Sequence, residues 1–459
     1  MSGHDSIGSS HRPLFPPYLN EQSHQAEVPK DWPDINMSGH HSIGSSHRPL
    51  FPPYLGPHEV QHCGSQTHTR PNTMHSLKPS SLLLLLGASL SAASVVPPRG
   101  GKNGGCSAID FLLSATADNN VYTNAPDPNN VDEILQFLTD AFTTGTAISG
   151  TTPVTGHYTI HAVYCKPAKK VKKHADTLQL LVHGVTYNST MWEGYGFGDQ
   201  YNWHAYFNAQ GYATLAIDRL GHGLSSRPDP LTVVQGAMHV EVIHQLITSV
   251  KTNSASNALD KGYSDIVYVG HSFGSQIGSQ VLHLHPSDIT AAILTGYSTF
   301  VNFTGIRNTF QWQPATLHDP SRFPSLPLGY VTIATEASRT VGFYGSKGTY
   351  DPAMAHFDFA HEDTFPDGEM GSTVFLAQPA RGYTNPVLVV TGTEDAIFCP
   401  DTKAECEKAL ANTGTTAFPD VPPSKFAYYA PVDTGHDLTL HYSAPNIMKR
   451  VHKWLEHSW

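Results

Sequence analysis

Ile266-Val-Tyr-Val-Gly-His-Ser-Phe-Gly-Ser275 is the segment that decides the fold. Its first four residues are an apolar run of the kind that forms a buried strand, and residues 274–285 favour a helix. Between them, residues 270–274 match the pattern Gly-x-Ser-x-Gly. A Cβ atom at either glycine would clash in a sharp strand-to-helix turn, and such a turn exposes the Ser272 hydroxyl. The pattern predicts a strained serine between a strand and a helix, with an ordinary glycine-rich turn as the alternative.

Similar apolar runs recur along the chain, at residues 178–182, 213–217, 291–294 and 386–390. Continuous apolarity indicates burial on both faces, as in a parallel sheet covered by helices. Helical stretches such as 231–252 lie between the runs. We therefore expect the α/β class, with a mostly parallel, doubly wound sheet and helices on both of its faces.

Composition supports a large folded chain and excludes one class of partner. The 459 residues include 20 Phe, 20 Tyr and 6 Trp, enough aromatic volume for a sizeable core. Lys and Arg number 27 against 38 Asp and Glu, so the formal net charge is −11. This sign is wrong for a protein whose main partner is nucleic acid, and we expect no such partner.

The front of the chain reads as two segments that lie outside the folded domain. Residues 1–19 and 37–55 are near-identical repeats rich in Pro, Ser, Gly and His, so we expect residues 1–73 to be disordered. Residues 74–93 combine Lys78, a leucine run and small residues, as in a secretory signal peptide cleaved after Ala93. We therefore expect a secreted protein without stable membrane insertion. An uncleaved signal-anchor that tethers the protein to a membrane is the alternative.

The rest of the chain divides into an extension and a main domain. Residues 94–157 are expected to be an N-terminal extension, in which residues 107–155 are loop-rich with one helix at 130–143. The main domain, 158–459, begins with a half-buried strand at 158–165. Residues 299–378 interrupt the strand rhythm, and we expect them to form an inserted cap over the carboxyl edge of the sheet, where ligands bind in open α/β sheets.

Cysteine usage agrees with export. Cleavage after Ala93 removes Cys63 and leaves four cysteines, which allow three pairings. We favour Cys399 with Cys406 and Cys106 with Cys165, with four reduced thiols as the alternative. Three triplets match the N-glycosylation pattern, and of their asparagines, Asn302 is the more credible acceptor compared with Asn36 and Asn188.

A serine hydroxyl is a weak nucleophile unless a base takes its proton and a third group orients that base. Asp395 stands just past the buried run 386–390, and His436 lies on a glycine-containing loop before the last helix. Their order after Ser272 is the one expected for this kind of turn. Glu394 is the alternative acid and His441 the alternative base.

Acyl transfer also needs N–H donors for the oxyanion that develops. The run 178–182 ends in His-Gly, which lets the following backbone N–H groups turn inward. We expect the N–H groups of Val185 and Phe273 to be the donors, with Thr186 as the alternative to Val185. The block from Asp218 to Ser225 is expected to be a tight turn that packs beside the Ser272 turn.

Together these motifs resemble the alpha/beta-hydrolase superfamily of the AB hydrolase-1 type, over roughly residues 158–459. The stretch His-Gly-Val-Thr-Tyr-Asn-Ser-Thr-Met-Trp, residues 183–192, is similar to that of secreted fungal serine esterases and lipases. The resemblance implies a catalytic triad of Ser272, Asp395 and His436.

The expected function is that of a secreted serine hydrolase, without a cofactor or metal, that cleaves small-molecule carboxylic esters through an acyl-enzyme. Trp192, His183 and His271 are expected to contact the substrate, and aromatic side chains of the cap are candidates for an apolar pocket. An amide or C–C bond hydrolase using the same triad and a non-catalytic binding module are the alternatives.

Overall fold

The computed structural model describes residues 105–253, 259 and 261–458. The predictions for the N-terminal repeat, the signal peptide, Cys63 and the acceptor Asn36 lie outside these residues. Among the described residues, no helix is both long enough and apolar enough to cross a bilayer.

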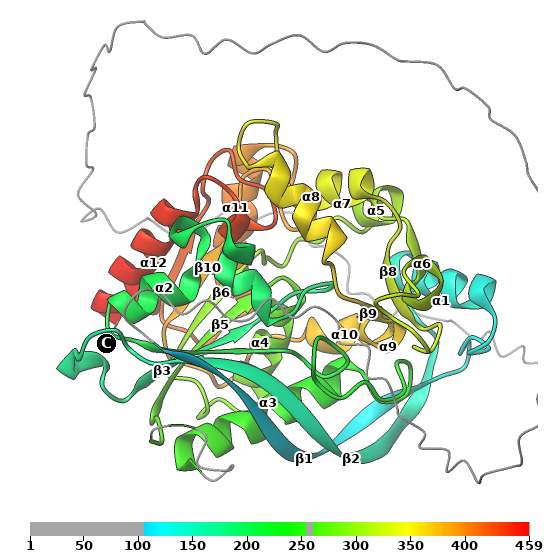
Figure 1. Ribbon diagram of the computed structural model, residues 1–459, viewed down its shortest axis with the longest axis horizontal. Helices are drawn as coiled ribbons and strands as arrows, with labels where there is room; N and C mark the ends of the chain where they lie inside the picture. The colour runs from blue at the N-terminus through cyan, green and yellow to red at the C-terminus, as the bar shows by residue number, and fades with distance from the viewer. Residues whose placement is uncertain (1–104, 254–258, 260, 459) are drawn as a thin grey trace, which may run out of the picture. The chain divides into compact units, whose positions relative to one another are not determined.

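The main sheet has eight strands in the order β1-β2-β4-β3-β5-β6-β10-β11 (Figure 1). The pairs β1/β2 and β2/β4 are antiparallel, and all the other pairs are parallel. This architecture confirms the predicted α/β class with a mostly parallel sheet. The strands are β1 Cys106–Tyr122, β2 Ile148–Cys165, β3 Thr177–Val182, β4 Ala213–Ile217, β5 Asp265–His271, β6 Ala291–Thr295, β10 Val387–Val390 and β11 Phe426–Tyr429.

The expectation of a loop-rich segment before residue 155 is wrong. Strand β1 pairs with β2 along its whole length, from Cys106 opposite Cys165 to Tyr122 opposite Ile148. Alternate side chains of β1 are buried, while Leu112 between them is 75% exposed. The expected boundary between residues 157 and 158 therefore falls inside β2.

Helices lie on both faces of the sheet. Helices α3 and α4 cover one face, and α2 and α12 pack together on the other (Figure 1). Helix α1 packs against α5, Phe303–Thr309, and α9, Asp367–Gly371, so the extension reaches the segment that precedes β10. The helices outside that segment are α1 Val131–Thr143, α2 Trp203–Ala209, α3 Gly236–Thr252, α4 Phe273–Leu284, α11 Lys403–Thr416 and α12 Ala444–Ser458, with short 3-10 helices at Lys172–His174, Ser189–Gly196, Asp199–Tyr201, Pro423–Lys425 and Leu438–Leu440.

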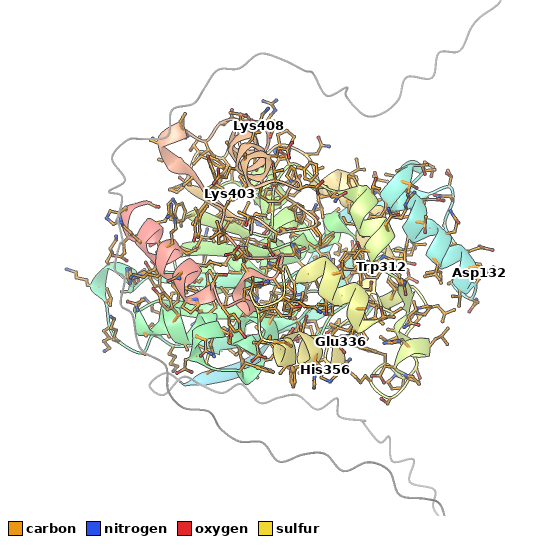
Figure 2. All side chains as sticks on the ribbon, turned by 90° about the horizontal axis from the view of Figure 1, so that it is seen from above. Asp132, Trp312, Glu336, His356, Lys403 and Lys408 are labelled. Carbon is orange, nitrogen blue, oxygen red and sulfur yellow. A yellow bond between two sulfur atoms is a disulfide. The ribbon has the colours of Figure 1, made fainter. Side chains whose placement is uncertain are left out.

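Between β6 and β10 the chain leaves the main sheet, in the region where a cap was expected. It forms short helices and a three-stranded antiparallel sheet of order β7-β8-β9. On the surface of this segment, a contact between the side chains of Glu336 and His356 joins its helices α7 and α8 (Figure 2). Its elements are α5 Phe303–Thr309, β7 Trp312–Pro314, α6 Ala315–His318, β8 Tyr330–Ile333, α7 Glu336–Phe343, α8 Pro352–Ala360, β9 Phe365–Pro366, α9 Asp367–Gly371 and α10 Thr373–Leu376.

Two disulfides are present, and they are the favoured pairs. Cys106 and Cys165 join the start of β1 to the end of β2, and Cys399 and Cys406 join the loop after β10 to α11. Disulfides are typical of proteins from oxidising compartments.

Candidate active site

Ser272 occupies the turn between β5 and α4 in a conformation that few residues adopt. Its φ of 55° and ψ of −119° lie in a region that costs about 1–3 kcal/mol for a residue with a Cβ atom. The flanking glycines are required by contact. A Cβ atom at Gly270 would lie 2.7 Å from the Cα atom of Ser275, and one at Gly274 would lie 2.3 Å from the carbonyl oxygen of Val182. The strained strand-to-helix turn predicted from the sequence is therefore present.

His436 is bound to Asp395 and to no rival acid. Its Nδ1 donates to Oδ2 of Asp395 at 2.8 Å, and Oδ1 of Asp395 accepts the backbone N–H groups of Ile397 and Phe398 at 2.8 and 2.9 Å. All three hydrogen bonds hold the carboxylate in place. Because Nδ1 donates, the lone pair of the neutral imidazole is on Nε2, which has no hydrogen-bond partner among the described residues.

The two alternative residues are engaged elsewhere. The carboxylate of Glu394 bonds the backbone and hydroxyl of Ser346 instead of a histidine. His441 donates from Nδ1 to the carbonyl of Asp437 at 2.8 Å and accepts the N–H of Gly435 on Nε2 at 3.1 Å. Neither ring nitrogen of His441 is left to act as a base.

The serine turn and the imidazole meet at the end of β6. The N–H of Ser272 donates to the carbonyl of Thr295 at 2.9 Å. The next residue, Gly296, lies against His436, because a Cβ atom there would be 2.9 Å from the ring carbon Cε1, which neighbours Nε2. Residues that follow β5, β6 and β10 thus meet the loop before the last helix at one edge of the sheet.

The pKa values of His436 and its neighbour His271 are shifted in opposite directions. Burial lowers the pKa of this imidazole, but the Asp395 carboxylate outweighs burial and raises the pKa above its ordinary value. The neighbouring His271 shows the opposite balance, because its burial lowers the pKa more than its bond to Asp437 raises it. His436 is therefore the better of the two rings for accepting a proton.

The expected oxyanion donors lie on the two loops beside Ser272. Gly184 abuts the serine, since a Cβ atom at Gly184 would be 2.8 Å from the Ser272 Cβ. Val185 follows it. Phe273 is the first residue of α4, where backbone N–H groups have no acceptor within the helix. The hydroxyl of Thr186, the alternative donor residue, accepts from Arg339 at 2.8 Å.

Aromatic rings border His436 on the cap side. The ring centroids of Phe343 and Phe398 lie 5.5 and 5.7 Å from that of His436, and Phe310 lies 5.1 Å from Phe343. Beyond Phe310 is a pocket of about 150 Å³ between α1 and the cap. Trp312, labelled in Figure 2, is part of its wall, and the lining residues are Leu135, Thr139, Phe142, Arg307, Phe310 and Trp312.

Comparison with known proteins identifies the family. The sequence model of the alpha/beta hydrolase family matches residues 179–446, more than half of the chain. The chain belongs to the alpha/beta hydrolase family. No curated protein sequence matches it. Membership of this family supports hydrolase activity.

Solved structures of other alpha/beta hydrolases are similar at low identity. An esterase from Rhodococcus is 17% identical, with 65% of this chain and 96% of that chain covered and a TM-score of 0.41. For an epoxide hydrolase from Vigna radiata the values are 14%, 65%, 94% and 0.42. For a soluble variant of monoglyceride lipase from Saccharomyces cerevisiae they are 14%, 66%, 93% and 0.44. The resemblance to secreted fungal members stays a prediction.

The three side chains expected to contact substrate are buried among protein groups. Both ring nitrogens of His183 have protein partners, the carbonyl of Gly184 at 2.8 Å and the N–H of Arg219 at 2.9 Å. His271 bonds Asp437 and Thr295 in the same way. Trp192 is fully buried against Trp203. Since these groups have no free polar atom or open face toward a ligand, with the exception of the buried indole N–H of Trp192, we assign them a supporting role.

Sequence reasoning missed a buried charged cluster beside the oxyanion loop. Arg339 of the cap binds Asp358 with two nitrogens, at 2.8 and 2.9 Å, and the same carboxylate accepts the hydroxyls of Tyr187, Tyr195 and Tyr344. These residues come from distant segments, and no local pattern in the sequence joins them.

Two groups of side chains among the described residues have the composition of metal ligands. One is His271, His436 and Asp437, which belongs to the site above. The other is His244, His285 and Asp288 between α3 and the end of α4. There the two imidazoles stack face to face at 3.8 Å and bind carboxylates, His244 to Asp288 and His285 to Glu241, so this group is satisfied without an ion.

Proposed function

We propose that the protein is a serine hydrolase that cleaves carboxylic esters through an acyl-enzyme, with Ser272, His436 and Asp395 as its triad. The observation that carries the proposal is the imidazole of His436, bonded to Asp395 through Nδ1 at 2.8 Å and unpartnered at Nε2 beside the strained serine turn. In structures without substrate the hydrogen bond between nucleophile and base is often long, and it tightens when substrate binds.

The chemistry follows from these positions. The Ser272 oxygen attacks the ester carbonyl while Nε2 of His436 takes the hydroxyl proton. Asp395 keeps the proton of Nδ1 in place and stabilises the imidazolium that forms. The N–H groups of Val185 and Phe273 bind the oxyanion. When the tetrahedral intermediate collapses, His436 returns the proton to the leaving alcohol, and a water molecule then releases the acid by the same sequence.

The surroundings favour a small ester with an apolar group. The rings of Phe343 and Phe310 continue from His436 toward the pocket beside α1, and Phe398 is a further aromatic ring against His436. Apolar walls bind apolar groups by removing them from water. We place the acyl or alcohol part of the substrate against these rings.

Fluorophosphonate labelling tests the proposal. The wild type is expected to label at Ser272 and to hydrolyse p-nitrophenyl esters, and Ser272→Ala to do neither. Ser321→Ala, which removes an exposed hydroxyl in the cap, is the matched control and should behave as the wild type. A wild type that does not label contradicts the serine mechanism. Labelling without activity on esters of any chain length contradicts the ester substrate and points to amide or C–C bonds.

We also propose that the protein is secreted after cleavage behind Ala93. The two disulfides support an oxidising destination. Sequencing the N-terminus of the exported protein tests this, with Ser94 expected as the first residue. Retention of all protein in the membrane fraction would contradict it.

A further inference from the structure

We propose that the buried pair Arg219 and Glu369 is a positioning device that holds both oxyanion donors of the active site. The inference rests on the function proposed above, and it assigns a role to two residues that touch no substrate. Arg219 follows β4, and Glu369 comes from α9 at the end of the cap segment. The pair therefore fastens the cap segment to the catalytic edge of the sheet.

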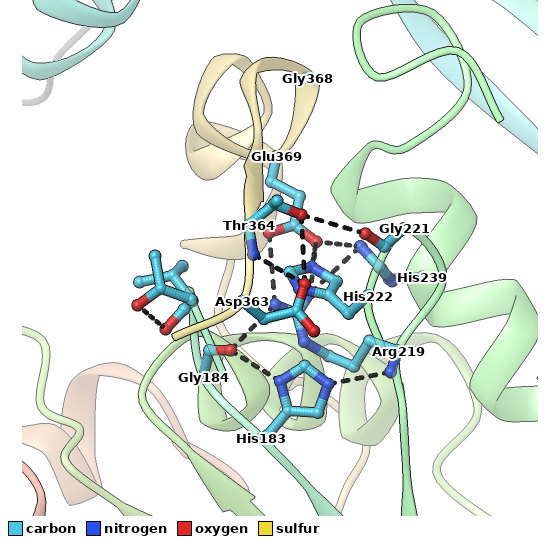
Figure 3. Close-up of polar contacts among 12 residues, drawn as sticks. His183, Gly184, Arg219, Gly221, His222, His239, Asp363, Thr364, Gly368 and Glu369 are labelled. Carbon is cyan, nitrogen blue, oxygen red and sulfur yellow. Dashed lines mark hydrogen bonds and ion pairs between the residues drawn. The ribbon is translucent and has the colours of Figure 1, made fainter. Parts of the chain in front are cut away.

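The carboxylate of Glu369 accepts hydrogen bonds from three side chains, which Figure 3 shows around it. Its side chain is fully buried and receives both terminal nitrogens of Arg219, with Nη2 at 3.3 Å from Oε2. Its Oε1 also accepts Nε2 of His222 at 2.9 Å and Nε2 of His239 at 2.5 Å. A buried charge pair depends on hydrogen bonding of this kind, and within the described residues Nε of Arg219 is the one nitrogen of the guanidinium without a partner.

The charges of this cluster are those of one ion pair among neutral rings. Burial raises the pKa of the Glu369 carboxyl, but Arg219, His222 and His239 together outweigh burial and hold the pKa well below its usual range. Burial and then Arg219 lower the pKa of His222 to about 4. Burial also lowers the pKa of His239. At neutral pH the two histidines are therefore uncharged donors, and Arg219 has one counter-charge.

The free side of the guanidinium reaches the first oxyanion loop. Nη2 of Arg219 donates to the carbonyl of Gly184 at 3.1 Å, and Nδ1 of His183 donates to the same oxygen at 2.8 Å. The N–H of Arg219 in turn fixes His183 through Nε2 at 2.9 Å. Arg219 thus holds the Gly184 carbonyl in two ways, directly through Nη2 and indirectly through His183 (Figure 3).

Fixing this carbonyl fixes the donor that follows it. The peptide between Gly184 and Val185 is trans, as are all peptide bonds that the structure describes, so its C=O and N–H point to opposite sides. With the carbonyl directed at Arg219, the Val185 N–H is directed away from it, on a loop that abuts Ser272. A rotation of this one peptide would withdraw the donor.

The same guanidinium contacts the second donor residue. The Arg219 carbon Cζ lies 5.1 Å from the centroid of the Phe273 ring, and the His239 ring packs on the same side chain at 6.2 Å. The N–H of Phe273 is the other expected oxyanion donor. Arg219 therefore contacts the peptide group that contains the first donor, through the Gly184 carbonyl, and the side chain of the second donor residue, while Glu369 holds Arg219.

A device of this kind acts on the transition state more than on bound substrate. Oxyanion donors work only within hydrogen-bond range of the position the charged oxygen occupies, and losing one costs about 100- to 1,000-fold in kcat. Displacing a donor should cost less than losing it. Since the ester carbonyl of the ground state needs these donors less, KM should change little.

The test uses Glu369→Gln, which keeps the shape of the side chain and removes the counter-charge of Arg219. Arg227→Lys is the matched control, because Arg227 binds Asp363 at 2.7 Å in a similar ion pair with no contact to Gly184 or Phe273. For each protein, active sites are counted by complete titration with a fluorophosphonate, and kcat per titrated site and KM are measured with a p-nitrophenyl ester. The inhibition constant of a trifluoromethyl ketone, which binds as an oxyanion, is measured alongside.

For Glu369→Gln we expect kcat per site to fall about 10-fold with KM within about 2-fold of the wild type, and the ketone to bind about 10-fold more weakly. Arg227→Lys should keep the wild-type kcat per site. A variant with fewer titratable sites, each with wild-type kcat, would show that the pair only stabilises the fold and would overturn the proposal.

Hydrogen exchange of residues 183–187 separates this proposal from the ester mechanism. Glu369→Gln should speed exchange in this loop and leave the central strands unchanged, whether or not the protein hydrolyses esters. Unchanged exchange in the loop overturns the positioning role. If the variant exchanges faster but the wild type does not label, the proposed serine mechanism is refuted, and what stands is that the pair holds the loop of residues 183–187.

Discussion

The protonation of His436 depends mainly on Asp395, with a smaller effect from Asp437. Burial lowers the pKa of the imidazole, and the Asp395 carboxylate at 2.8 Å more than compensates, so the pKa is raised above 6.5. A general base must be neutral before it can take a proton. Because a raised pKa keeps the ring protonated to a higher pH, activity should be lost as the pH falls through a midpoint above 6.5.

Asp395→Asn should change both the rate and the position of this midpoint. An amide cannot stabilise the imidazolium, so kcat is expected to fall by about 10,000-fold. Without the Asp395 carboxylate, burial is opposed only by the charge of Asp437, the smallest of the effects that raise the pKa of His436, so the acid limb of kcat/KM should move to lower pH. The measurement is the pH profile of ester hydrolysis from about pH 5 to 9.

Glu394→Gln is the control for this profile, since Glu394 is adjacent in the chain but bonds Ser346. It should keep the wild-type midpoint. If Asp395→Asn keeps that midpoint and Glu394→Gln moves it, the acid has been misassigned.

At this scale the sequence was informative where a motif is local. Ser272 and Asp395 each stand shortly after a buried apolar run, and His436 follows in the expected order, so composition and order select them as candidates, and the structure joins His436 to Asp395. Arg219 and Glu369 are separated by 150 positions, and only the fold brings them together. Arg219 and Asp437, which bond His183 and His271, also come from other segments, so the sequence does not show that protein groups hold these rings.

Among the elements, the continuous apolar runs correctly predict the parallel strands β3, β4, β5, β6 and β10, whereas the sequence does not reveal strand β1. Its buried positions 113, 115 and 117 hold Leu, Ala and Ala, with polar Ser114 and Thr116 between them and Asp118 after them. Small side chains produce a weak alternation that resembles a loop. Pairing with β2 over seventeen residues stabilises the strand in spite of its composition.

Helix α9 holds two buried carboxyl groups with opposite behaviour. Glu369 has Arg219 and two histidines as donors, and its pKa is depressed. Asp367, two residues earlier, has no partner for Oδ1 among the described residues. Burial, and after it the charge of Asp229, raises the pKa of Asp367 to about 8. One short helix therefore contains both a satisfied carboxylate and a carboxyl group held in its neutral form.

This contrast predicts how stability depends on pH. Asp367 keeps its proton in the folded state up to about pH 8, whereas the unfolded chain releases it near 3.8. Folded protein therefore binds more protons in this range, and its free energy of unfolding falls as the pH rises through it. Asp367→Asn, which does not titrate, should flatten the decline and be more stable than the wild type at pH 8.

Urea unfolding at about pH 5 and 8 measures the effect as a difference between variant and wild type. Asp401→Asn removes an exposed carboxylate and should leave the wild-type slope. A wild type and Asp367→Asn that decline in parallel between the two pH values would show that Asp367 is ionised in the folded protein.

At the scale of the whole molecule, the two disulfides fasten regions with different duties. Cys106 and Cys165 close a loop with a sequence separation of 59 at the edge of the sheet, away from the triad. Cys399 and Cys406 close one with a separation of 7, and the N–H of Cys399 donates to the carbonyl of Asp395 at 3.2 Å. The long bridge restricts the unfolded chain more, while the short bridge steadies the loop that contains Asp395, the proposed catalytic acid.

Removing each bridge separately should therefore have different consequences. Because the entropy lost by the unfolded chain grows with loop length, Cys106→Ala with Cys165→Ala should lower the free energy of unfolding by roughly 2 kcal/mol more than Cys399→Ala with Cys406→Ala. Activity should respond in the reverse order, with kcat per active site unchanged in the first double variant and reduced in the second. Urea unfolding and titrated kinetics on both proteins measure the two effects. Equal losses of stability, or a lower kcat only in the first variant, would mean that the bridges do not divide stability and catalysis in this way.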